Sequence, residues 1–145
     1  MLRMKTVLAA FGLMALAGTA MAQGDVIAER RAGLKRMGGH MEAIKPVVEA
    51  KGDVKALEPR IDDMIVFYRT LPSRFPAGSG TGDTKALPAI WTDFAGFETA
   101  NKALLGQLAV LKTAAAAGDA AAFGAAYAET GPKFCGGCHR PYRSR

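Results

Sequence analysis

The chain has 145 residues, with 19 Lys and Arg against 13 Asp and Glu, 50% apolar side chains and two Cys. This length suits one domain and argues against a large multidomain enzyme. The apolar content is too high for a disordered chain, and two Cys are too few for a disulfide-stabilised scaffold. The basic residues are spread among acids rather than gathered with aromatic residues, which argues against nucleic-acid binding.

Residues 1–22 have the pattern of a secretory signal. Arg3 and Lys5 precede an apolar run from Val7 to Ala17, and Ala20 and Ala22 supply the small residues that signal peptidase recognises. The apolar run is too short to span a bilayer comfortably, although an uncleaved membrane anchor is the alternative. We therefore expect residues 23–145 to be exported to the periplasm, with no membrane-spanning segment.

Apolar residues at helical spacing predict the first two helices. One stripe runs from Ile27 through Leu34, Met37 and Met41 to Val48. The next runs from Leu57 to Leu71, where Pro72 stops it.

Two more helices are expected after a Gly-rich loop from Pro76 to Pro88. The third stripe runs from Ile90 to Leu111, and the fourth runs from about Ala120 into the Cys region, with a kink expected at Gly131-Pro132. No run of alternating residues competes as a strand. The pattern therefore predicts an all-α protein, an antiparallel four-helix bundle.

The Gly-rich loop does not match a phosphate-binding motif. It reads Gly78-Ser79-Gly80-Thr81-Gly82, but no strand precedes it and no Lys-Ser or Lys-Thr pair follows. We interpret it as a connection between helices.

The sequence Cys135-Gly136-Gly137-Cys138-His139 carries the chemistry. On a helix, residues three and four apart share a face, so both thiols and the imidazole project together. Two thiols can add to the vinyl groups of one haem while the imidazole reaches the iron. The C-x-x-C-H pattern is the c-type haem attachment site, so we expect one covalent haem c.

Three other interpretations of these residues are weaker. A thioredoxin-like dithiol needs a βαβ pattern, which is not visible. A zinc site needs a fourth ligand, and the chain offers only His40 beyond this motif. A disulfide between residues three apart on a helix is strained.

The chain resembles the class II c-type cytochromes, above all cytochrome c′. The resemblance rests on the haem motif near the C-terminus, followed by Tyr142-Arg143, and on three upstream segments. These segments are Arg30-Arg31-Ala32-Gly33-Leu34, Leu71-Pro72-x-x-Phe75-Pro76 and Ile90-Trp91-x-Asp93. They extend the likeness over nearly all of residues 23–145.

The resemblance implies a role for each motif residue. His139 is the proximal iron ligand, and Cys135 and Cys138 form the thioether links. Low-spin relatives have a Met ligand four residues after the first-helix Arg, but here that position, counted from Arg30, is Leu34. A hydrocarbon has no lone pair to donate, so we expect five-coordinate, high-spin iron.

Two Met residues keep a six-coordinate iron open as an alternative. Met37 and Met41 lie on the Leu34 stripe, and a thioether on either could ligate the iron if the haem sits lower along the helix. A Met at helical spacing is more often a core residue. His40 falls off this stripe, and we expect it at the surface.

Three Arg residues are expected to border the haem. The resemblance implies that Arg143 borders the proximal side; the alternative is a solvated charge that complements the helix dipole. We expect Arg30, and Arg31 as a second candidate, to neutralise a haem propionate by a charge-assisted hydrogen bond. Aromatic residues expected in the core or the haem wall are Phe75, Trp91, Phe94, Tyr127 and Phe134.

A vacant iron position behind Leu34 predicts binding of nitric oxide and carbon monoxide. Dioxygen should bind poorly, because no distal hydrogen-bond donor is evident. The alternative is a Met-ligated electron carrier with an unknown redox partner protein. A peroxidase-like enzyme lacks support because no distal His can act as acid and base. The family often forms homodimers through its first two helices, which the sequence permits.

Overall fold

A computed structural model describes residues 8–145 of the chain, with side chains from Gly24 onward. Residues 1–7 of the expected signal segment lie outside the described residues. Cleavage after Ala22 therefore stays a prediction.

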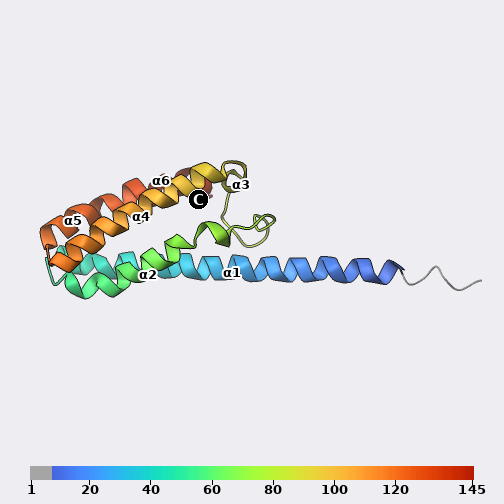
Figure 1. Cartoon of the computed structure of the whole chain (residues 1–145), viewed down its shortest axis with the longest axis horizontal. Coiled ribbons are helices and arrows are strands. Elements are labelled where there is room, and N and C mark those ends of the chain that lie inside the picture. The colour runs from blue at the N-terminus through green and yellow to red at the C-terminus, as the bar shows by residue number, and fades with distance from the viewer. Residues whose placement is uncertain (1–7) are drawn as a thin grey trace, which may run out of the picture.

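The described chain is a bundle of four helical segments (Figure 1). Helices α1 (Leu8–Glu49) and α2 (Glu58–Arg69) form one antiparallel pair, linked by a 3₁₀ turn at Lys55–Leu57. After a second such turn, Pro72–Arg74, and the Gly-rich loop, the short helix α3 (Ala89–Thr92) leads into α4 (Phe94–Ala117). The predicted all-α four-helix bundle is confirmed.

The fourth segment is composite. It begins as α5 (Ala120–Glu129), continues as a π-helical turn (Thr130–Cys135) and ends as α6 (Gly136–Tyr142). The wide turn contains Gly131 and Pro132, and Pro132 has no N–H to donate to a regular α-helical ladder. The kink expected at this pair is therefore present, and it lies immediately before the haem motif.

The predicted apolar stripes form one core. Their fully buried members include Met37 and Ile44 on α1, Ile61 and Met64 on α2, and Leu108 on α4. Burying a side chain of this size contributes about 1.5–3 kcal/mol of transfer free energy, so packing rather than helix propensity stabilises the bundle.

The third predicted helix is interrupted at Asp93. Its backbone leaves the helical region (φ −130°, ψ 53°), and its carboxylate accepts a hydrogen bond from the backbone N–H of Gly96 at 3.2 Å. Asp93 is thus an N-cap, a role that Asp fills because its oxygen satisfies a free N–H of the first turn. The apolar periodicity continues across the break, which explains why the sequence pattern alone predicts one helix.

A glycine and an aspartate make the tight turn between α4 and α5. Gly118 adopts a left-handed conformation (φ 68°) that ends α4, and the Asp119 carboxylate caps α5 by accepting from Ala122 N–H at 2.9 Å. This turn sets α5 antiparallel to α4.

Within the described part of the chain, no helix combines the length and the hydropathy needed to cross a membrane.

Candidate functional site

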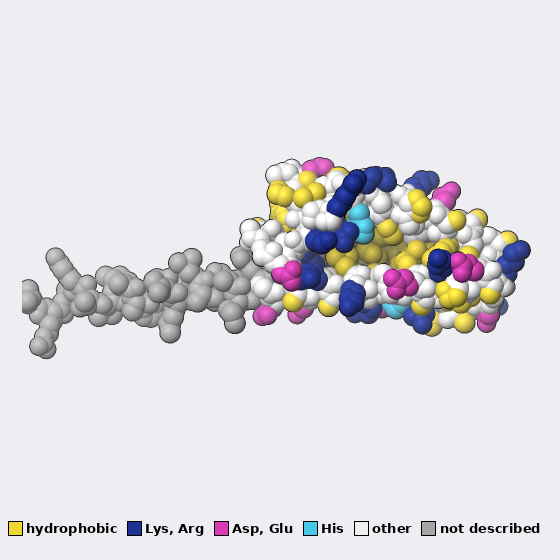
Figure 2. All heavy atoms as spheres, turned by 180° about the vertical axis from the view of Figure 1, so that it is seen from behind, with side chains coloured by type: hydrophobic (Ala, Val, Ile, Leu, Met, Phe, Trp, Pro, Cys, Tyr) yellow, Lys and Arg dark blue, Asp and Glu magenta, His cyan; other side chains and the backbone are white. Residues whose placement is uncertain are grey.

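A large cavity opens between α1, the end of α2, the start of α4, and α6. Its volume is about 1070 Å³. This is at the upper end of the range for ligand and cofactor sites, about 300–1,000 Å³. Figure 2 shows the hollow with hydrophobic side chains on its floor and with Lys, Arg and a His side chain gathered over one end.

The haem motif lies in the wall of this cavity. The π-helical turn ends at Cys135 and α6 begins at Gly136, and Cys135, Cys138 and His139 all line the hollow. The predicted shared face is therefore present. Both thiols are half-buried and form no disulfide. Burial raises the pKa of Cys135, and burial with the neighbouring Cys135 raises the pKa of Cys138 to about 11.

His139 lies at the edge of the cavity. Partial burial, and then the positive charge of Arg143, lower the pKa of its imidazole. Both effects favour the neutral ring, which is the form that binds metals. The environment of His139 is therefore suited to a metal ligand.

Helix α1 forms a wall of a different kind. Leu34, Met37 and Met41 line the same cavity, with Met37 only 1% exposed. These residues come from one stripe, as predicted. Their side chains offer hydrocarbon and thioether groups but no hydrogen-bond donor.

Arg30 is deeply buried and fixes the Gly-rich loop to α1. Its guanidinium donates to Ser79 Oγ at 2.9 Å, Ser79 O at 2.8 Å, Thr84 Oγ1 at 2.8 Å and Arg74 O at 3.3 Å. It also stacks 4.4 Å from the centre of the Phe75 ring. Burial lowers its pKa. None of these partners carries a negative charge, so a carboxylate placed in the cavity would complete the site electrostatically.

Arg31 and Arg143 are both exposed residues at the cavity mouth. Arg31 forms an ion pair with Asp83 of the Gly-rich loop. Arg143 is not on the same helix as His139, because α6 ends at Tyr142 and Arg143 is extended. Its backbone pairs with Ala86, which brings the guanidinium to the mouth from outside the helix.

Several residues that position the site gave no clear signal in the sequence. Ser79 is completely buried within a loop that reads as a simple connection, and only its contact with Arg30 shows its role. Tyr142 donates to the Asp93 carboxylate at 2.8 Å and so joins α6 to the start of α4. The match of Asp93 to the family pattern indicates this acceptor, but it does not indicate that Tyr142 is the donor.

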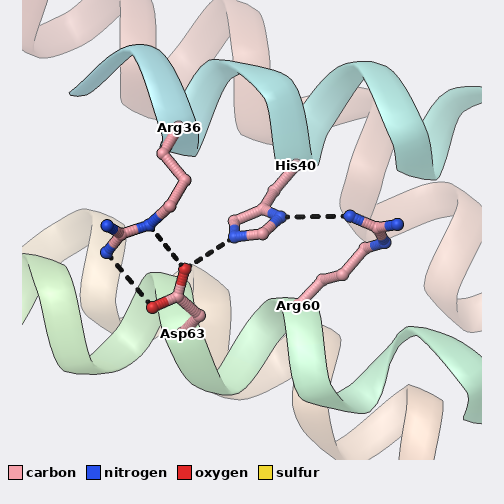
Figure 3. Close-up of polar contacts among 4 residues, drawn as sticks. All are labelled: Arg36, His40, Arg60 and Asp63. Carbon is pink, nitrogen blue, oxygen red and sulfur yellow. Dashed lines mark hydrogen bonds and ion pairs between the residues drawn. The ribbon is translucent and has the colours of Figure 1, made fainter. Parts of the chain in front are cut away.

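The expectation that His40 is a simple surface residue is wrong. Its side chain is only 15% exposed and lies between α1 and α2, with Nε2 at 2.7 Å from Asp63 Oδ2 (Figure 3). Arg60 reaches Nδ1 at 3.3 Å, and Arg36 binds both oxygens of Asp63. An Arg can only donate, so in this contact Nδ1 is the acceptor and Nε2 is the atom that faces Asp63. These four residues join α1 to α2, away from the cavity lining.

Most of the aromatic residues are placed as expected. Phe75 and Tyr127 line the cavity, whereas Trp91 and Phe134 pack against the core without lining it. Phe94 is a correction, because it is 37% exposed and belongs to neither the core nor the haem wall.

The residues present fit a haem better than a bare metal ion. Among the described side chains, no three His, Cys, Asp or Glu gather as metal ligands. A haem needs only one protein ligand for its iron, an apolar slot and two thiols for covalent attachment. The cavity offers all three, with a buried cation at Arg30.

The fold and the motif together define a c-type haem protein built on a four-helix bundle. The chain belongs to the cytochrome c′ family: the family model described as Cytochrome C' matches residues 25–143. Resemblance to this family is thus confirmed, and the chain carries one covalent haem c, as its family does.

Individual relatives agree with this assignment. The chain is 44% identical to a cytochrome c′ from Rhodopseudomonas palustris over 111 residues, covering 72% of this chain and 71% of the relative. It is also similar to the crystal structure of cytochrome c′ from Rubrivivax gelatinosus, with TM-score 0.75, 29% identity, and coverage of 84% of this chain and 97% of that one. A nitric oxide complex of a variant of cytochrome c prime from Alcaligenes xylosoxidans matches with TM-score 0.76, 26% identity, and coverage of 85% and 97%.

Proposed function

We propose that this chain is a periplasmic haem protein that binds nitric oxide and carbon monoxide at an open iron position next to Leu34. The observation that carries the proposal is the composition of the α1 wall, where a hydrocarbon side chain faces the cavity shared with the haem motif. The bound haem supplies an iron centre that accepts a small neutral ligand and exchanges one electron.

Cys135 and Cys138 hold the ring by thioether bonds. Addition of each S–H across one vinyl group of a haem would place sulfur on one carbon and hydrogen on the other, with no leaving group. His139 would supply a neutral imidazole to the iron from the same end of the cavity. The π-helical turn directs these three side chains into the cavity from one end.

Leu34 would exclude water from the iron and has no lone pair to offer it. Carbon monoxide and nitric oxide are small and nearly apolar, so they enter such a space without needing a hydrogen bond. Bound dioxygen is more polar and is stabilised by a distal donor. The side chains of Leu34, Met37 and Met41 provide none, which favours the first two gases.

Arg30 and Arg143 line the cavity at a buried and an exposed position, respectively. The guanidinium of Arg30 is the buried charge that a propionate would neutralise, with Arg31 as a more exposed second donor already paired with Asp83. Arg143 stands beside His139, where it meets a ligand that arrives on the proximal side.

A second function is supported by one observation. Met37 is almost completely buried and lines the cavity one helical turn from Leu34, so a thioether is available near the ring. If it bound the iron, the protein would be a low-spin electron carrier. The relatives named above are all cytochromes c′, which does not favour this alternative.

Attachment is tested by intact mass of the protein exported to the periplasm. We expect a chain that begins near Gln23 and carries the mass of one haem that acid-acetone does not extract. Cys135→Ala/Cys138→Ala should lose this covalent mass, whereas Thr113→Ala, at an exposed site on α4, should retain it. Extractable haem in the unaltered protein would contradict the proposal.

Two features of the proposed function concern absences or assembly. We expect no peroxidase turnover, because the α1 wall supplies no acid–base group to the cavity; a steady-state assay with hydrogen peroxide measures this activity.

We also expect a homodimer through α1 and α2, which analytical ultracentrifugation of the haem-loaded protein tests.

A further inference from the structure

The net positive charge of this protein is concentrated at the cavity mouth. Four exposed cations from three separate segments line it: Arg31 and Lys35 from α1, Lys85 from the Gly-rich loop, and Arg143 from the C-terminal end. The tail reaches the loop through two backbone hydrogen bonds, Ser144 N–H to Lys85 O at 2.8 Å and Leu87 N–H to Tyr142 O at 3.0 Å, which together form the bridge between Arg143 and Ala86. Arg140 and Arg145 flank the same end of the chain.

The charge balance elsewhere is close to neutral. Arg3 and Lys5 are the only basic residues among the first 22, which leaves 17 basic and 13 acidic side chains in the rest of the chain. Six of these cations are the mouth and flanking residues just named, against one acid, Asp83, among the described cavity-lining residues. The remaining 11 basic and 12 acidic side chains nearly cancel.

This concentration is unfavourable for the isolated protein. Arg31 and Lys35 lie four residues apart on one helix, where like charges destabilise by a few tenths of a kcal/mol. Some of the other cations are paired with acids, as in Lys112 with Asp62 at 2.5 Å and Lys45 with Glu49 at 3.7 Å. Of the four mouth cations, only Arg31 has an acidic partner among the described residues.

The residues that would hold the haem lie close to this mouth. Cys135 and Cys138 are half-buried and His139 is exposed, so a ring bonded to them has its linked edge close to solvent. Six cations and one acid, Asp83, leave a positive excess here. Two haem propionates and the C-terminal carboxylate would reduce this excess but would not cancel it. A protein that docks on this mouth therefore meets both a positive rim and the redox group.

We propose that the mouth cations Arg31, Lys35, Lys85 and Arg143 form the docking surface for an acidic electron-transfer protein. This inference rests on the proposed haem site and identifies the kind of redox partner that the site takes. The bound haem would accept one electron from the reduced partner, so the partner would be oxidised by one electron and ferric iron reduced to ferrous. No atom or proton is exchanged.

A protein is favoured over a membrane or a nucleic acid by the shape of the surface. The exposed cations line an opening with an apolar interior rather than a flat or elongated basic face, and only four of them do so. Electrostatic complementarity of this size mainly raises the association rate, by orders of magnitude at low salt.

The test uses the haem-loaded protein and a reduced plant-type ferredoxin as an acidic probe, with a potential of about −400 mV. Stopped-flow absorbance gives the second-order rate constant for haem reduction. We expect it to fall at least about tenfold between 10 mM and 500 mM ionic strength. A photoreduced uncharged flavin, which needs no docking, should show almost no such dependence.

Variants with equal charge change locate the surface. Lys35→Glu should lower the ferredoxin rate constant about tenfold at low ionic strength, and Lys35→Glu/Lys85→Glu should lower it further. Lys102→Glu, at an exposed position on α4 outside the cavity lining, should change it less than about twofold. All variants should react with the uncharged flavin at the same rate.

Each outcome has a distinct meaning. Equal losses in Lys35→Glu and Lys102→Glu, or a rate independent of ionic strength in a haem-loaded protein, would overturn the docking surface alone. A second result would also overturn the docking proposal. If the protein binds anionic phosphatidylglycerol vesicles through Lys35, while Lys35→Glu leaves ferredoxin reduction unchanged, the surface binds a membrane. A protein without covalent haem would overturn the proposed function, and the docking proposal with it.

Discussion

The two helical walls of the haem cavity differ in both structure and chemistry. On the α1 side, a regular helix presents Leu34, Met37 and Met41 from one apolar stripe. On the other side, the helix is interrupted by the π-helical turn, which ends at Cys135 and precedes Cys138 and His139 on α6. Regular periodicity is sufficient for an apolar wall, whereas placing three reactive side chains at one end of the cavity accompanies a break in the helix.

The contrast also separates two tasks. In the proposed function, the irregular wall would attach the cofactor and supply the proximal ligand of its iron. The regular wall would then control what else reaches the iron, because Leu34 would exclude ligands by shape rather than by bonding. A change on one wall should therefore alter attachment, and a change on the other should alter ligand choice.

The largest effect on stability is expected at Arg30, which connects the α1 wall to the loop. Arg30→Met keeps much of the volume but leaves the acceptors on Ser79 and Thr84 without their donor. We expect the free energy of unfolding to fall by about 3 kcal/mol, since each buried unsatisfied group costs about 1–3 kcal/mol. Chemical denaturation of the haem-loaded protein measures it.

The exposed Arg69 on α2 provides the matched control. Arg69→Met should change stability by less than about 0.5 kcal/mol. Similar losses in the two variants would show that the buried contacts of Arg30 do not hold the loop.

The α1 wall is tested next by shortening Leu34. Leu34→Ala enlarges the space above the iron and relieves steric contact with a bound ligand, so carbon monoxide affinity should rise about tenfold, or about 1.4 kcal/mol. Equilibrium titration of the ferrous protein followed by absorbance measures the affinity. Leu71→Ala, just after the end of α2 in the same cavity, is the control, and an equal rise there would assign the effect to cavity volume alone.

A change on the α6 side should affect a gas that binds the proximal face of the haem more than one that binds the distal face. Arg143→Ala removes a charge beside His139, so nitric oxide kinetics should change several-fold while carbon monoxide binding changes little. The stability cost should stay below about 1 kcal/mol, because the side chain is exposed. Flash photolysis with each gas provides the rates, and equal effects on both would argue against a role at one face.

The smallest effect is expected far from both cavity walls, at Asp63. A hydrogen bond from His40, followed by Arg36, lowers the pKa of this carboxyl below its usual value. Its stabilising contribution is therefore present above the unfolded-state pKa, about 3.9, and is lost as the pH falls through the lower folded-state pKa. Asp63→Asn should cost less than about 1 kcal/mol at pH 7, and the difference should vanish in strong acid.

Thermal unfolding of the unaltered protein and of Asp63→Asn from pH 7 to pH 2 checks this prediction. Asp119→Asn is a useful comparison, because Asn keeps an oxygen for the α5 cap while removing the charge. A stability difference for Asp63→Asn that is the same at every pH would show that its charge contributes nothing.

The sequence predicts the parts of the fold that depend on periodicity. The four stripes, the kink at Gly131-Pro132 and the shared face of the haem motif all follow from spacing, and the structure contains them. The break at Asp93 was missed because the stripe continues across it, and a cap is visible only when the backbone leaves the helix.

Long-range polar contacts were beyond the sequence. The bonds between Arg30 and Ser79 and between Tyr142 and Asp93 each span 49 positions, and no local pattern fixes such pairs. The same holds for His40, which lies off the apolar stripe of α1 but is covered by α2 and its charged residues. The family resemblance indicated Arg30 and Asp93, but only the fold shows their partners.

The coordination of the iron is the central claim, and absorption spectra of the purified ferric and ferrous protein test it most directly. A hydrocarbon at Leu34 predicts five-coordinate, high-spin ferrous haem, with Met37→Leu and Met41→Leu spectra unchanged from the unaltered protein. Low-spin ferrous haem together with a near-infrared sulfur-to-iron band in the ferric state would contradict it. Loss of that band in Met37→Leu or Met41→Leu would then identify the ligand and make the chain an electron carrier.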